Sequence, residues 1–177
     1  MIPFPKKKYQ IIYADPPWSY REKNYNQMGK TNASTDHYQT IDTKDIACIP
    51  VCEISDDDCL LFMWATSPNL NQAFIVGEAW GFKYITVGFV WDKRITLVGN
   101  YTLSQYEQCL IFKKGKIPQP RGARNILQKV DWRKEEHSKK PPEVRDRIHR
   151  MFPEQSKIEL FARWSGNDIW DVWGDET

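Results

Sequence analysis

The sequence predicts an α/β protein with a largely parallel sheet. Short apolar runs of strand character alternate along the chain with segments of helical pattern, and this order is typical of helices packed on a mostly parallel sheet. The chain has 177 residues, of which 41% are apolar, and this fits one domain with an ordinary core. Because no internal repeat is visible, we expect a single domain over residues 1–177.

The first predicted strand covers residues 9–14, a short apolar run that ends at Asp15. Pro16 and Pro17 stop it, because a proline has no N–H to give to a sheet ladder. Residues 19–36 are polar, so we expect a loop there. A short helix over residues 43–48, a strand over 59–65 and a helix over 68–80, opened by Pro68 and ended by Gly81, complete the first half.

The second half begins with strands over residues 82–91 and 108–113, the first of them rich in β-branched and aromatic side chains. A helix is expected over residues 141–152, because apolar side chains recur there at helical spacing on one face. That face consists of Val144, Ile148, Met151 and Phe152. Strands over residues 157–162 and 169–173 complete the predicted sheet.

Positive charge is concentrated in one part of the chain. Residues 113–150 hold thirteen Lys and Arg against five Asp and Glu, so this part carries a net +8 while the whole chain carries +2. Within it, residues 114–140 lack clear periodicity, and a loop of this length is functional or disordered. The charge, together with the aromatic Trp132, favours a surface that faces a polyanion such as nucleic acid. A solvated loop with no specific partner is the alternative.

The cysteines do not indicate a metal centre. Cys59 and Cys109 lie in apolar strand-like runs and are expected to be buried. Cys48 and Cys52 are close together, but no histidine or second pair lies nearby, so we expect no metal site. No apolar run approaches the roughly 20 residues that a membrane span needs, and no signal peptide is visible, so we expect a cytoplasmic protein without membrane contact.

The clearest chemical motif is Asp15-Pro16-Pro17-Trp18, directly after the first strand. Ligands of α/β sheets bind at the carboxyl ends of strands. The amino group of adenine is a poor nucleophile, and two acceptors for its hydrogens would activate it: the Asp15 carboxylate and the Pro16 carbonyl. Trp18, or Tyr20 nearby, could stack on the base. The alternative is a strand-ending turn with an Asp cap and a core Trp.

The sequence resembles the MTA-seventy family of adenine methyltransferases, which includes the catalytic subunit of the eukaryotic messenger-RNA adenosine methyltransferase. It is most similar to the short bacterial and phage members. The resemblance extends over nearly the whole chain. The matching segments, in order, start at Ala14, His37, Leu61, Gly81, His137, Lys157 and Trp173, and read ADPPW, HYQT, LFMWAT, GFKY, HSKKP, KIELFAR and WGDE.

The resemblance implies a Rossmann-like fold that binds S-adenosylmethionine, with its motifs permuted so that the catalytic strand comes first and the cofactor strand lies near the C-terminus. The catalytic residues it implies are Asp15, Pro16, Pro17 and Trp18. The cofactor-binding residues it implies are Lys140, Glu159, Phe161, Arg163, Asp175 and Glu176. Lys140 and Arg163 suit the methionine carboxylate, and Asp175 or Glu176 suits the ribose hydroxyls. Taken singly, each of these charges could be an ordinary surface residue.

The resemblance also implies a substrate pocket formed by Tyr20, His37, Tyr38 and Thr40, although His37 is equally well a polar residue flanking a helix. Two departures from the family pattern stand out: Tyr106-Glu107 replaces a His-Glu pair, and Asp175 stands where relatives more often have Asn. We expect methyl transfer to the 6-amino group of adenine in nucleic acid, DNA rather than RNA, and a possible homodimer. The alternatives are an RNA methyltransferase, a non-catalytic nucleic-acid-binding relative, and a methyltransferase for small amines or protein side chains.

Overall fold

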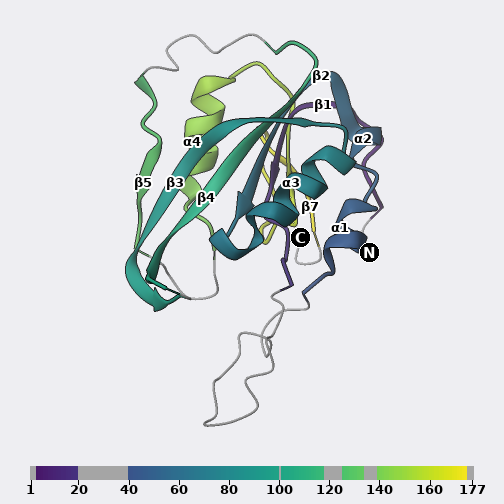
Figure 1. Cartoon of the computed structure of the whole chain (residues 1–177). Helices are drawn as coiled ribbons and strands as arrows, with labels where there is room; N and C mark the ends of the chain where they lie inside the picture. Colours follow the sequence, from purple (N-terminus) through teal and green to yellow (C-terminus); the bar gives the residue numbers. More distant parts are fainter. Residues whose placement is uncertain (1–2, 20–39, 100, 118–124, 134–138, 175–177) are drawn as a thin grey trace.

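The computed structural model describes residues 3–19, 40–99, 101–117, 125–133 and 139–174, and its central element is a seven-stranded sheet (Figure 1). The strands lie in the order β5-β3-β4-β2-β1-β6-β7. Only β4 runs antiparallel to its neighbours, so the predicted α/β class with a largely parallel sheet is confirmed. The elements are β1 (Tyr9–Ala14), α1 (Thr43–Ala47), α2 (Val51–Ile54), β2 (Ser55–Ala65), the 3-10 helix η2 (Ser67–Asn69), α3 (Leu70–Ala79), β3 (Lys83–Val98), β4 (Leu103–Lys114), β5 (Lys129–Asp131), α4 (Pro142–Met151), β6 (Lys157–Leu160) and β7 (Asp171–Trp173).

Helices cover both faces of the sheet, with α4 on one face and α1, α2 and α3 on the other (Figure 1). Successive side chains of a strand point to opposite faces, and β1 shows this clearly. Ile12 and Ala14 join the core under α1 to α3, whereas Ile11 and Tyr13 join the core under α4. If this alternation continues for one more residue, the Asp15 side chain lies on the face of the sheet that α4 covers.

The central strand β1 pairs in parallel with β2 on one side and with β6 on the other. Its neighbour β6 comes from the far end of the sequence. The carboxyl ends of two strands that are distant in the chain therefore lie side by side. In this register Tyr13 lies opposite Glu159, and Ala14 lies opposite Leu160. Glu159 therefore shares the α4 face with Tyr13.

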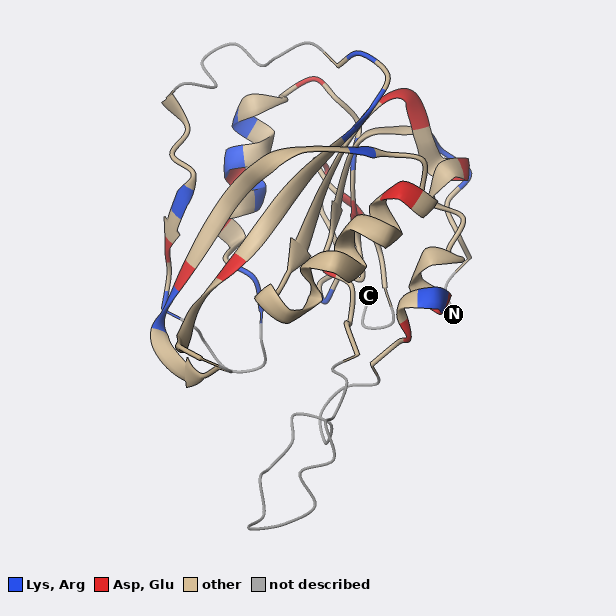
Figure 2. Cartoon of the chain, viewed as in Figure 1, with Lys and Arg blue, Asp and Glu red and all other residues tan. Residues whose placement is uncertain are grey.

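Strands β3 and β4 form a hairpin that extends past the carboxyl end of β2. The pairing of β2 with β4 stops at Ala65 and Gln108, while β4 pairs with β3 as far as Leu103. The described residues of the hairpin between Ile95 and Tyr106 are uncharged and are drawn in tan in Figure 2. Val98 and Tyr101 are almost fully exposed there.

Most predicted elements are confirmed, with differences at their ends and two additions. The strands expected at 82–91 and 108–113 are longer, because they continue into the hairpin. The helix expected at 68–80 begins as η2 and ends at Ala79, after which Gly81 adopts the left-handed φ of 87°. The short elements α2 and β5 were not predicted. Cys59 and Cys109 are buried as expected. Among the described residues, no helix combines the length and the apolar character needed to span a membrane.

Candidate active site

The turn after β1 holds the predicted catalytic residues against the ends of two other strands. The Asp15 N–H faces the Leu160 carbonyl at 3.5 Å, and the Trp18 N–H donates to the Pro16 carbonyl at 2.8 Å. The Trp18 ring is buried, and its Nε1 donates to the Trp64 carbonyl at 2.9 Å. Asp15 therefore sits on a fixed backbone, and the structure shows Trp18 as an anchor of the turn.

The chain turns sharply at the end of β6. Phe161 has a φ of 61°, in the left-handed region that non-glycine residues rarely adopt. The next residue is tied to β7, because the Ala162 N–H donates to the Trp173 carbonyl at 3.1 Å. Gly174 passes so close to the Ala162 backbone that a Cβ would lie 2.4 Å from its carbonyl oxygen. A side chain at Gly174 would therefore displace the loop that follows β6.

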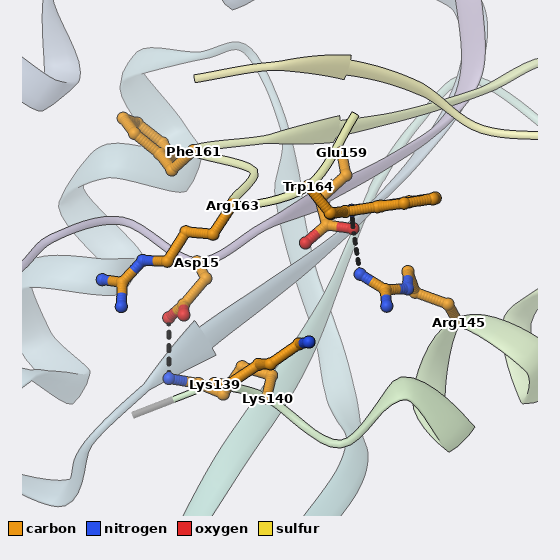
Figure 3. Close-up of a pocket in the computed structure, with 8 residues that line it drawn as sticks. All are labelled: Asp15, Lys139, Lys140, Arg145, Glu159, Phe161, Arg163 and Trp164. Atoms are coloured by element: carbon orange, nitrogen blue, oxygen red, sulfur yellow. Dashed lines mark hydrogen bonds and ion pairs between the residues drawn. The ribbon is translucent and has the colours of Figure 1, made fainter. Parts of the chain in front are cut away.

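These two turns and the segment before α4 enclose a pocket (Figure 3). It brings Asp15, which is predicted to be catalytic, together with four of the six residues predicted to bind the cofactor: Lys140, Glu159, Phe161 and Arg163. In Figure 3, Phe161 and Arg163 lie on one side of Asp15, and Arg145 lies on the other. The full lining is Asp15, Lys139, Lys140, Arg145, Glu159, Phe161, Arg163 and Trp164.

Asp15 is one end of a chain of ion pairs, which we call the four-charge network. The Lys140 Nζ lies 2.9 Å from Asp15 Oδ1 and 3.2 Å from Glu107 Oε2. The Lys93 Nζ lies 3.3 Å from Glu107 Oε1. All four side chains are largely buried, with Asp15 the most exposed at 22%. Two cations thus neutralise two carboxylates, one from the turn after β1 and one from β4.

Burial and charge shift the pKa values of this network in different directions. Burial raises the pKa of Asp15, although Lys140 partly offsets the rise. Burial also tends to raise the pKa of Glu107, but Lys140 and Lys93 outweigh it, so that pKa is lowered. For Lys140, burial favours the neutral form, but the two carboxylates prevail and raise its pKa. Lys140 is therefore charged at neutral pH, and Asp15 gains a proton more readily than Glu107 does.

A second cluster lies across the pocket and contains Arg145, Glu159 and Trp164. The Arg145 Nη1 and the Trp164 Nε1 both donate to Glu159 Oε2, each at 2.8 Å. The Arg145 guanidinium also lies over the Trp164 ring, with its central carbon 4.3 Å from the ring centroid. Burial raises the pKa of Glu159, and Arg145 opposes the rise.

Some predicted site residues lie away from the pocket or outside the described residues. Thr40 is exposed, and the next residue, Ile41, donates its N–H to the Pro17 carbonyl at 3.0 Å, in the turn that follows β1. Base stacking by Trp18 and contact of Thr40 with the substrate stay predictions. Tyr20, His37, Tyr38, Asp175 and Glu176 lie outside the described residues.

Sequence reasoning missed several residues of the site. Glu107 was singled out only as a departure from a family pattern, and the buried Lys93, Arg145 and Trp164 were not singled out at all. Glu107 could have been identified from the sequence, because it is an acidic residue two positions before Cys109, which lies in a strand that was expected to be buried. The basic segment also differs from expectation, because Lys140, Arg145 and Arg147 are engaged in internal ion pairs rather than in an open surface.

The comparisons with known proteins agree with this architecture. The MT-A70 family profile matches residues 9–176. The type II methyltransferase M.MunI of a Mycoplasma species is 47% identical over 97% of this chain and 79% of its own length. The human N(6)-adenosine-methyltransferase catalytic subunit METTL3 is 28% identical over 88% of this chain, which spans 26% of its length. An Arabidopsis thaliana MT-A70-like N(6)-adenosine-methyltransferase is 28% identical over 86% of this chain and 21% of its own length.

The family profile covers almost the whole chain, and the Mycoplasma relative is similar over most of both proteins. The family that the motifs indicated is therefore confirmed, and so is the expected class of enzyme, a methyltransferase. The chain belongs to the MT-A70 family.

Proposed function

We propose that this protein transfers a methyl group from S-adenosylmethionine to the 6-amino group of adenine in DNA. The observation that carries the proposal is the pocket itself, because it unites Asp15 with Glu159, Phe161 and Arg163 at the ends of adjacent strands. The motif Asp15-Pro16-Pro17-Trp18 and the residues after β6 are remote in sequence, yet they meet where α/β sheets bind their ligands.

The turn after β1 supplies acceptors suited to an amino group. Lys140 pairs with Asp15 Oδ1, so the second carboxylate oxygen, Oδ2, is the one that would accept a hydrogen bond from the substrate. The Pro16 carbonyl accepts from the Trp18 N–H, and a carbonyl oxygen has a second lone pair for the other amino hydrogen. Two fixed acceptors would draw the amino nitrogen toward a tetrahedral, nucleophilic geometry.

The charged and aromatic side chains of the pocket support S-adenosylmethionine as the methyl donor. When bound, that molecule supplies an electrophilic methyl group on a sulfonium. Glu159 and Lys140 would lie near its charged end, and Phe161 would contact its nucleoside part. We assign Arg163 to the nucleoside as well, in place of the methionine carboxylate that the resemblance implies, because Arg163 lies beside Phe161 and on the opposite side of Asp15 from Arg145 (Figure 3). Asp175 and Glu176 are proposed for the ribose hydroxyls. The carboxylates of Asp15 and Glu159 favour a cationic sulfonium, while Lys140 keeps the charge around Asp15 balanced.

DNA is proposed over RNA because the 47% identical relative is called a type II methyltransferase, a term used for DNA-modifying enzymes. An adenine in a duplex must leave the base stack to reach a pocket of this kind. The proposed substrate-binding residues are Tyr20, His37, Tyr38 and Thr40, and we also propose that the protein forms a homodimer.

The test is methyl transfer from radiolabelled S-adenosylmethionine to duplex DNA, single-stranded DNA and RNA, followed by nucleoside mass spectrometry. Methylated deoxyadenosine is the expected product. The Asp15→Asn variant should lose at least about 100-fold in rate: with its amide oxygen held by Lys140, it presents an NH2 donor where the carboxylate presents an acceptor. The matched control is Asp45→Asn on α1, an exposed position at which the rate should not change. Full activity of Asp15→Asn would contradict the proposal, and methylated adenosine alone would move the function to RNA.

A further inference from the structure

Arg145 and Glu159 form an ion pair inside the pocket. The resemblance implies a cofactor-binding role for Glu159, but it implies no role for Arg145. Their atoms Nη1 and Oε2 are 2.8 Å apart, and their side chains are 17% and 10% exposed. Arg145 comes from α4 and Glu159 from β6, so the pair also joins the helix to the sheet. Both residues line the pocket together with Asp15.

The pair is held rigidly. The Trp164 Nε1 donates to the same Oε2 that Arg145 contacts, and the Trp164 ring stacks on the guanidinium. Arg145 is thus fixed from two directions, by a carboxylate and by an aromatic face. A charged group that is ordered before binding loses little conformational entropy when a ligand arrives, which favours affinity.

Besides Arg145, the lining contains the cations Lys139, Lys140 and Arg163. Arg163 lies on the other side of Asp15 (Figure 3), and the ammonium of Lys140 is already shared. It lies within 3.2 Å of carboxylate oxygens from both Asp15 and Glu107. Withdrawing it would leave two buried carboxylates without their common cation, which is costly. Arg145 balances only one carboxylate, and its planar guanidinium carries five N–H donors, which suits a second carboxylate.

We infer that Arg145 and Glu159 form the seat for the amino-acid end of the methyl donor, with Arg145 receiving the carboxylate and Glu159 receiving the ammonium. An α-amino acid carries one charge of each sign on neighbouring atoms, and this pair presents the complementary charges side by side. The inference rests on the proposed function. It gives the donor two separate sets of residues, since Phe161 and Arg163 lie on the opposite side of Asp15 from Arg145 (Figure 3).

The test measures binding by calorimetry with three ligands and without nucleic acid. S-adenosylmethionine has both charges of the amino-acid end, its decarboxylated analogue keeps only the ammonium, and 5′-dimethylthioadenosine has neither but keeps the sulfonium. The protein should bind S-adenosylmethionine at least about tenfold more tightly than the decarboxylated analogue, as a charge-assisted hydrogen bond predicts. Arg145→Met should abolish this preference by weakening only the binding of S-adenosylmethionine.

Two further variants separate a binding role from a structural one. Arg150→Met, on the exposed side of the same helix, should leave all three affinities unchanged. Glu159→Gln should weaken the binding of the two ligands that carry the ammonium more than the binding of 5′-dimethylthioadenosine, which shares their sulfonium. Thermal unfolding of each variant checks that it folds. If Arg145→Met does not fold, the binding measurements on Glu159→Gln provide the test.

The outcomes are distinct. An Arg145→Met protein that keeps the preference for S-adenosylmethionine, or that loses affinity equally for all three ligands, overturns the inference. A wild-type protein that binds S-adenosylmethionine and its decarboxylated analogue equally well overturns the inference alone. A wild-type protein that binds none of the three overturns the proposed function as well.

Discussion

The two charged clusters beside the pocket are built on different plans. The four-charge network draws Asp15, Glu107, Lys93 and Lys140 from four separate segments, and one lysine serves two carboxylates. The second cluster is a single ion pair closed by a neutral indole. Removing Lys140 from the first cluster therefore affects two carboxylates at once, whereas removing Arg145 from the second affects only Glu159. We therefore assign the first to holding Asp15 and the second to holding a ligand.

The largest effect is expected from Lys140→Met. This variant leaves Asp15 and Glu107 buried without their common cation, and we expect a loss of about 2–4 kcal/mol in the free energy of unfolding. Urea denaturation at pH 7 measures it. The matched control is Lys139→Met, since Lys139 is exposed and should contribute less than about 0.5 kcal/mol. Equal stability of the two variants would show that the network does not hold the site together.

A smaller loss is expected from Arg145→Met. Only Glu159 loses its cation, and Trp164 still donates to it, so we expect a destabilisation of about 1–2 kcal/mol. The same denaturation series measures this value. If Arg145→Met proved more destabilising than Lys140→Met, the proposed difference between the clusters would be reversed.

The mildest perturbation is a change of pH without any substitution. Asp15 must be ionised to accept from the amino group, and burial raises its pKa. Methyl transfer should therefore decline on the acid side with a midpoint above about 4, the ordinary value for aspartate. A pH–rate profile over the range in which the protein stays folded measures the midpoint, and a value below 4 would contradict the expected environment of Asp15.

The effect of pH on folding has the opposite sign for the two acids of the network. Because the pKa of Asp15 is raised on folding, its contribution to stability is present below its unfolded pKa and is lost as pH rises through the folded value. The pKa of Glu107 is lowered, so its contribution is present above its unfolded pKa and is lost as pH falls through the folded value. The two contributions offset each other in part, and we expect activity to respond to acid more steeply than stability does.

Residues near the strand ends could be predicted from the sequence, whereas contacts across the sheet could not. The apolar run before Asp15 and the two prolines after it located β1 and the catalytic turn. Glu159 could be placed because it lies in a strand with a recognisable family motif. Glu107 and Lys93 lie on strands whose register with β2 depends on the whole hairpin. Pairing across strands is a tertiary property that local pattern does not encode.

Because Ile11 pairs with Lys157, β1 can complete its pairing only late in the synthesis of the chain. A ribosome releases β1 early, but this strand can acquire its β6 neighbour only after most of the chain has been synthesised. Long-range pairing of this kind must wait for the intervening chain and slows folding. Asp15 thus leaves the ribosome long before Trp164, so a nascent or truncated chain would carry the Asp15 carboxylate without the residues that complete the pocket around it.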